Sequence, residues 1–264
     1  MHQSAGEMSP LRRILEQLRV TVTSLADESV STDVGWAART SSLPRVWTLN
    51  QVRIVNQVDP DQAERLAEDL QGDLVFRHLV VEDDEVGSQI RGPLIERGWT
   101  YERELLMAMT VPPPESDDDT SQVVELDEEQ MLVLMARWLL EERLEMTAEG
   151  LEQVLEYNRR EGRLWNETRF GVLDDAGSPV AVTKLRCDST VAWIEDVYTA
   201  PEARGLGFAH SLISVATRMP WRSGRDLTFI IADDNDWPKE FYARAGFEPV
   251  GVLHTFHKTV ADLH

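Results

Sequence analysis

Apolar residues in the first part of the chain recur with two different periods. Helical spacing is found in three segments, residues 10–20, 61–70 and 87–98. Strand-like segments lie between and after them, at residues 48–55, 76–81 and 101–111. The last segment carries apolar Leu105, Met107 and Met109 in alternation, which places the three on one face of a strand. This part of the chain is therefore predicted to be an α/β unit rich in strands.

The second part of the chain shows the same mixture of periods. An opening strand is predicted at residues 122–126, and Asp127 is a suitable N-cap for a helix over residues 128–142. A second helix is expected at residues 148–160. Further strands are expected at residues 168–173, 179–187, 193–199 and 227–232, the first two joined as a hairpin across residues 174–178. We expect a mixed, mostly antiparallel sheet flanked by helices.

A proline-rich and acidic segment separates these two parts. Three consecutive prolines are followed by Glu115 and a run of aspartates, a composition that favours an extended, solvated chain. We therefore predict an N-terminal domain over residues 1–111, a linker over residues 112–122 and a second domain over residues 123–264.

A glycine-containing turn follows the strand at residues 193–199 and precedes a helix. Its residues are Arg204, Gly205, Leu206, Gly207, Phe208 and Ala209. Glycine lets the backbone approach a ligand closely, and the first turn of a helix presents unpaired N–H groups and a positive dipole. The turn is a candidate pyrophosphate site, although the same glycines could serve a tight connection that binds nothing.

A second motif lies about thirty residues downstream and contains Asn235, Pro238, Phe241-Tyr242 and Gly246-Phe247. In this order, the two motifs resemble the acetyl-CoA signature of the GNAT family of N-acetyltransferases, with Pro238 where a small residue is usual. The resemblance covers roughly residues 123–259. It implies an acyl-CoA N-acyltransferase fold and acetyl-CoA as the acetyl donor.

The resemblance also implies roles for individual residues. Main-chain groups of Val197, Tyr198 and Thr199 would line acetyl-CoA, and an N–H of one of the first two would bind the thioester oxygen. Residues 204–209 would hold the pyrophosphate, and Asn235 would position the cofactor or the main chain.

Two side chains are predicted to be catalytic. The phenol of Tyr242 would be the general acid, because it is protonated at pH 7 and can protonate a departing thiolate. Glu195 would be the base that accepts the proton of the amine. Its neighbour Asp196 is the alternative, since alternation along a strand predicts that the two carboxylates project to opposite faces.

The pattern of the first half repeats part of the second. The first half contains a strand ending in Val80-Val81, then a helix, Gly98 and a final strand. The second half contains the same series, with a strand at Ile230-Ile231, a helix, Gly246 and a final strand. The first copy has no equivalent of the glycine turn, and Leu94 stands where the second has Tyr242. We therefore predict a tandem arrangement whose N-terminal half does not bind acetyl-CoA in the standard way.

Composition narrows the range of partners. The chain has 47 acidic and 26 basic residues in 264, a net charge of −21, which disfavours nucleic acid because phosphates would be repelled. No apolar run is long enough for a membrane helix, and the N-terminus lacks a secretory signal pattern, so a cytoplasmic location is expected. A single cysteine, Cys187, excludes an intramolecular disulfide, and the histidines show no metal spacing, so no metal is expected.

The leading hypothesis is an acetyl-CoA-dependent N-acetyltransferase acting on a primary amine of unknown identity, as a monomer or homodimer. A small-molecule amine and a protein amine are both open, because the acceptor walls of this fold are variable. The alternatives are a sensor that binds acyl-CoA without turnover and an interaction scaffold.

Overall fold

The computed structural model describes residues 8–113, 119–142 and 146–260. The elements of its first half are α1 (Pro10–Leu25), β1 (Glu28–Thr32), β2 (Gly35–Arg39), the 3-10 helix η1 (Trp47–Leu49), β3 (Val52–Ile54), α2 (Pro60–Gln71), β4 (Phe76–Val81), α3 (Asp84–Glu96) and β5 (Thr100–Met109). Those of its second half are β6 (Val124–Glu125), α4 (Glu128–Glu142), α5 (Ala148–Leu164), β7 (Asn166–Leu173), β8 (Pro179–Cys187), β9 (Val191–Thr199), the 3-10 helix η2 (Pro201–Ala203), α6 (Phe208–Arg222), β10 (Leu227–Asp233), α7 (Pro238–Arg244) and β11 (Glu248–Thr259).

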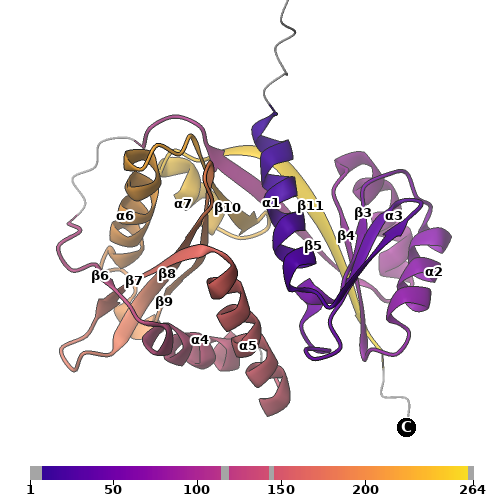
Figure 1. The fold of residues 1–264 in the computed structure, drawn as a ribbon, viewed down its shortest axis with the longest axis horizontal. Helices are drawn as coiled ribbons and strands as arrows, with labels where there is room; N and C mark the ends of the chain where they lie inside the picture. The colour runs from indigo at the N-terminus through magenta and orange to yellow at the C-terminus, as the bar shows by residue number, and fades with distance from the viewer. Residues whose placement is uncertain (1–7, 114–118, 143–145, 261–264) are drawn as a thin grey trace, which may run out of the picture.

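Among the described residues, the strands form one eleven-stranded sheet in the order β1-β2-β3-β4-β11-β5-β10-β9-β8-β7-β6. The β3–β4 and β9–β10 pairs are parallel, and the other pairs are antiparallel. Helices cover the sheet (Figure 1). This confirms the predicted fold class, a mixed and mostly antiparallel sheet flanked by helices.

The two halves of the sheet meet at the central pair of β11 and β5. β11 lies between β4 and β5, and β5 lies between β11 and β10, so each half contributes its last strand to the sheet of the other. Figure 1 shows β11, in yellow, running from the second half alongside the strands of the first. In the first half, β4 comes before the exchanged strand β5 and pairs in parallel with β3. In the second half, β10 comes before the exchanged strand β11 and pairs in parallel with β9, so the two halves agree in the way that the predicted internal repeat requires.

Most predicted elements are present, and the exceptions have local causes. The strand expected at residues 48–55 is only β3, because Asn50 holds the preceding chain in the 3-10 helix η1. Its side-chain amide donates to the carbonyls of Leu43 and Val46, and its oxygen accepts from the N–H of Thr40 (all 2.9 Å). The β1–β2 hairpin was not predicted, since β1 is an exposed edge strand without an apolar face.

The end of the segment predicted as a linker lies close to α6. Residues 114–118 lie outside the described residues, but the carbonyl oxygen of Asp119 accepts a hydrogen bond from Ser211 Oγ of α6 (2.7 Å). The end of this segment is thus tied to the first turns of α6.

The helices of the second half lie on two faces of the sheet. Leu212 and Ile213 of α6 and Tyr242 of α7 share a core cluster with Ala192 and Ile194 of β9. The intervening residue Trp193 points to the other face, where it joins a cluster containing Ile14 of α1. α5 also lies on that second face, because Glu161 of α5 reaches Arg186, the residue opposite Trp193. In the part of the chain that the structure describes, no helix is long and apolar enough to cross a membrane.

Candidate acetyl-CoA site

The sheet opens between β9 and β10. The two strands pair from Val191 and Leu227 to Ile194 and Ile230, although both continue beyond that point. β10 stays with β5 up to Asp233, while β9 stays with β8 up to Thr199. An extended ligand could therefore replace the missing neighbour of β9 over its last residues.

The main-chain groups of β9 at this opening follow from its pairing with β8. Ala200 donates its N–H to Val180 O (2.8 Å), toward β8. Where the pairing with β8 is regular, N–H groups alternate between the two edges of the strand, so that of Thr199 points toward the edge that β10 has left and that of Tyr198 points toward β8. The N–H of Tyr198 is therefore directed away from the opening, which leaves Val197 as the candidate donor to a thioester oxygen.

The turn after β9 leaves the start of α6 accessible. Gly205 (φ +79°) and Gly207 (φ +83°) adopt left-handed conformations, and a Cβ added at either would meet no atom within 4 Å. Gly207 is the N-cap of α6, no side chain caps the helix, and its first turn has no acidic residue. Arg204 Nε donates to Thr199 O (3.1 Å), which ties the turn to β9. Free helical N–H groups and a positive dipole end are what a phosphate requires.

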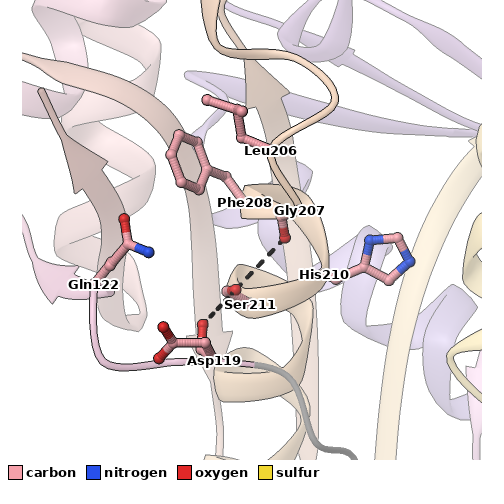
Figure 2. A pocket seen from close by; sticks show the side chains of 7 residues that line it. All are labelled: Asp119, Gln122, Leu206, Gly207, Phe208, His210 and Ser211. Carbon is pink, nitrogen blue, oxygen red and sulfur yellow. Dashed lines mark hydrogen bonds between the residues drawn. The ribbon is translucent and has the colours of Figure 1, made fainter.

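A pocket of about 330 Å³ lies beside this helix end. Figure 2 shows the residues that line it: Asp119, Gln122, Leu206, Gly207, Phe208, His210 and Ser211. The carboxylate of Asp119 accepts from the N–H of Ser121 (2.9 Å). Since Asp119 carries a negative charge, an anion bound here would lie on the side of Gly207.

Tyr242 lies in α7 within the core cluster that also contains Ile194 and Ile230, the last paired residues before the opening. Its side chain is buried, and this burial raises the pKa of Tyr242 above its ordinary value. The phenol therefore stays protonated over the neutral range, as a proton donor must. Asn235 is exposed in the turn between β10 and α7, where its N–H binds Asp233 Oδ1 (2.7 Å).

Glu195 and Asp196 lie on the same face of the sheet, contrary to the alternation expected from the sequence. Glu195 forms an ion pair with Arg186, and Asp196 forms one with Lys184. Lys184 and Arg186 are two residues apart on β8, so they share a face. The cause is a β-bulge, because two residues of β9 (Asp196 and Val197) oppose one of β8 (Thr183), and Asp196 has a positive φ of 52°.

Behind Glu195 lies a buried group of charges that the sequence did not reveal. Arg186 is fully buried and binds Glu161 (2.7 Å) and Glu167 (2.8 Å) as well as Glu195. Burial raises the pKa of Glu195, Arg186 opposes the rise, and the nearby carboxylate of Glu161 adds to it. Of the three carboxylates, Glu195 has by far the most exposed side chain, at 26% against 1% and 2%. The sequence feature that could have indicated these buried charges is the presence of Lys184 and Arg186 within an otherwise apolar predicted strand at residues 179–187.

The two predicted catalytic side chains therefore lie on opposite sides of the opening. Tyr242 belongs to the α6–α7 face with Ile194, and Glu195 belongs to the α5 face with Trp193. A group held between β9 and β10 could be approached by a base from one side and by an acid from the other.

The corresponding place in the first half is closed. β3 and β4 pair up to their last residues, Ile54 and Val81, and the N–H of Glu82 then donates to Ile54 O (3.0 Å). The start of α2 is occupied by its own N-cap, since Asp59 Oδ1 accepts from the N–H of Gln62 (2.8 Å). A carboxylate at this position excludes a phosphate.

Comparison with known proteins identifies the family of one part of the chain. Residues 166–249 match the family described as the acetyltransferase (GNAT) domain. No curated protein is significantly similar to the chain.

Solved structures of similar fold extend over both halves. A functionally unknown conserved protein from Staphylococcus epidermidis ATCC 12228 has a TM-score of 0.66 at 13% identity, covering 93% of this chain and 100% of that one. A GCN5-related N-acetyltransferase from Kribbella flavida has a TM-score of 0.61 at 18% identity, covering 96% and 97%. Another from Sphaerobacter thermophilus has a TM-score of 0.55 at 19% identity, covering 81% and 75%.

The fold is therefore that of the acyl-CoA N-acyltransferases. Within that class, the chain carries an acetyltransferase domain of the GNAT family in its second half, as the sequence motifs indicated.

Proposed function

We propose that this protein transfers an acetyl group from acetyl-CoA to a primary amine by direct attack in a ternary complex. The observation that carries the proposal is the opening between β9 and β10 beside an uncapped helix end at Gly207. The opening suits an extended thioester arm, and the helix end suits a pyrophosphate. Residues 204–209 and Asn235 are the groups that we assign to the cofactor.

In the proposed reaction, the main-chain N–H of Val197 polarises the thioester carbonyl, and Thr199 pairs with the arm of the cofactor. Glu195 accepts the proton of the amine, directly or through water, on the α5 face. The amine nitrogen forms a bond to the carbonyl carbon, the carbon–sulfur bond breaks, and Tyr242 protonates the thiolate on the α7 face. A raised pKa suits Glu195 to a base, since it makes the carboxylate a better proton acceptor.

We infer that the acceptor is bound on the α5 face, between α5 and the first half. The loop before η1 packs on α5, where the N–H of Arg45 donates to Gln153 Oε1 (2.8 Å) and Arg45 Nε binds Glu149 (2.9 Å). Residues 143–145, in the connection between α4 and α5, lie outside the described residues. On this view residues 1–111 form a domain that shapes the acceptor site, residues 112–122 a linker, and residues 123–264 the catalytic domain.

Two measurements test the proposal. Isothermal titration of the full-length protein with acetyl-CoA should give saturable binding, and its absence would contradict the site. Release of free CoA thiol with a panel of primary amines should then identify turnover.

The alternative is an acyl-CoA sensor without turnover, and it differs in one outcome. A sensor would bind acetyl-CoA yet release thiol no faster with any amine than without one. The protonated Tyr242 and the carboxylates on the α5 face favour the enzyme, because binding alone needs neither.

A further inference from the structure

Trp237 is unusually exposed for a tryptophan. All eight tryptophans lie within the described residues, and Trp237 is the only one of them that is exposed, with 65% of its surface accessible. It lies at the N-cap of α7, two residues after Asn235. An indole left in water forfeits a large part of the free energy that burying an aromatic ring provides. The exposed indole therefore offers an aromatic face that another flat ring could cover.

The neighbours of Trp237 connect it to the start of α6. Its ring lies 6.2 Å from that of Phe241, and Phe241 lies 4.7 Å from His210, edge to face. Phe241 is buried and fixes the position of this row, while His210 is exposed. His210 is in the first turn of α6 and lines the pocket beside Gly207 (Figure 2). The row of rings therefore runs from the candidate phosphate site to the exposed indole.

This arrangement matches the chemical order of acetyl-CoA. Its thioester arm would enter the opening between β9 and β10, and its pyrophosphate would reach the helix end at Gly207. The adenosine follows the pyrophosphate and must then lie near the surface beyond the first turn of α6. A flat purine base gains free energy by stacking on an aromatic ring, and the exposed face of Trp237 is available for that contact.

We propose that Trp237 is the stacking platform for the adenine base of acetyl-CoA, with Phe241 holding its position. The proposal rests on the proposed function, since it takes acetyl-CoA as the donor. It makes Trp237 a residue that distinguishes a donor with an adenine base from one without it.

The test compares two donors with the full-length protein and three variants. Acetyl-CoA carries the adenosine, and S-acetyl-4′-phosphopantetheine has the same thioester arm without it. Trp237→Ala should weaken acetyl-CoA binding by about tenfold, at the lower end of the range for base stacking, while changing the affinity for the shorter donor less than twofold. Trp237→Phe retains an aromatic ring, so its affinity for acetyl-CoA should fall much less. Met219→Ala, at an exposed apolar side chain of α6, should change neither affinity.

The outcomes separate this proposal from the proposed function. If the unmodified protein does not bind acetyl-CoA, the proposed function fails. If the protein binds acetyl-CoA but Trp237→Ala weakens the binding of both donors equally, or of neither donor, the proposed adenine platform is wrong. The proposed function then still stands. An unchanged affinity together with an altered oligomeric state in gel filtration would instead make the indole an interface between copies, which also overturns the proposal.

Discussion

Glu195 and Asp196 are adjacent in β9, yet both carboxylates lie on the α5 face of the sheet, bound to Arg186 and Lys184. The β-bulge that produces this arrangement lies where β9 leaves β10. It concentrates negative charge at the side of the opening that we assign to the amine. An ammonium group arriving there would meet two partly exposed carboxylates.

The first prediction assigns the base. Glu195→Gln should lower kcat by about 10²-fold, because the amide cannot accept the proton. In the unmodified protein the rate should rise with pH, with a midpoint above the ordinary range of a carboxyl group, since burial raises the pKa of Glu195 and only its deprotonated form is active. That rise should be absent from the pH profile of Glu195→Gln. Asp196→Asn is the matched control, and loss of the rise in this variant alone would transfer the role to Asp196.

The second prediction concerns the proton donor. Tyr242→Phe should lower kcat by about 10²-fold with little change in acetyl-CoA affinity, because only a hydroxyl is removed from a buried ring. An assay of released CoA thiol measures kcat, and titration calorimetry measures the affinity for acetyl-CoA. Tyr101→Phe is the control: it removes a phenol that lies in β5 and is hydrogen-bonded to His254 of β11, so it should leave kcat unchanged. Normal turnover by Tyr242→Phe would assign the proton to water.

The third prediction tests the phosphate site. Gly207→Glu should abolish detectable acetyl-CoA binding, since a carboxylate would enter the space that the phosphate needs. Gly177→Glu is the control, because Gly177 has a similar φ of +81° and open space around it but lies in the β7–β8 turn. The control has the same backbone strain and should bind acetyl-CoA normally. Equal loss in both variants would point to misfolding instead of a site.

The fourth prediction concerns the buried charges. Arg186→Met should cost about 3–5 kcal/mol of unfolding free energy, because it leaves buried carboxylates without their cation. Arg186 lowers the pKa of Glu195, so its removal would raise that pKa further, and the variant should be most stable at acid pH and lose stability as pH rises through it. Urea unfolding at pH 5.5 and pH 8 measures this. Arg137→Met, at an exposed ion pair with Glu202, should leave the unfolding free energy nearly unchanged at either pH, because solvent screens that pair.

The fifth prediction is a stoichiometry of one acetyl-CoA per chain. The first half has no opening between β3 and β4, and Asp59 caps α2 where a phosphate would need to lie. Calorimetric titration gives the number of sites directly. Two equivalents per chain would show that the first half binds acetyl-CoA by a different arrangement.

The sequence by itself determined the local features of this protein. Alternation and helical spacing predicted β4, β8 and α4 to the residue, because these patterns report which face of an element is buried. The turn at residues 204–209 was also recognisable, since only glycine adopts the positive φ found at Gly205 and Gly207 without strain. Together with Tyr242, these residues indicated the family that the domain comparison then showed.

Only the tertiary structure decided how the parts meet. The exchange of β5 and β11 joins strands more than a hundred residues apart, and no local pattern specifies such pairing. The face taken by Asp196 depends on a bulge that breaks the two-residue period of β9, so alternation gave the wrong answer there. The burial of Arg186 among three carboxylates likewise arises from the packing of α5 on β7, β8 and β9. These features depend on contacts between residues that are far apart in the sequence, so the pattern of any single segment does not report them.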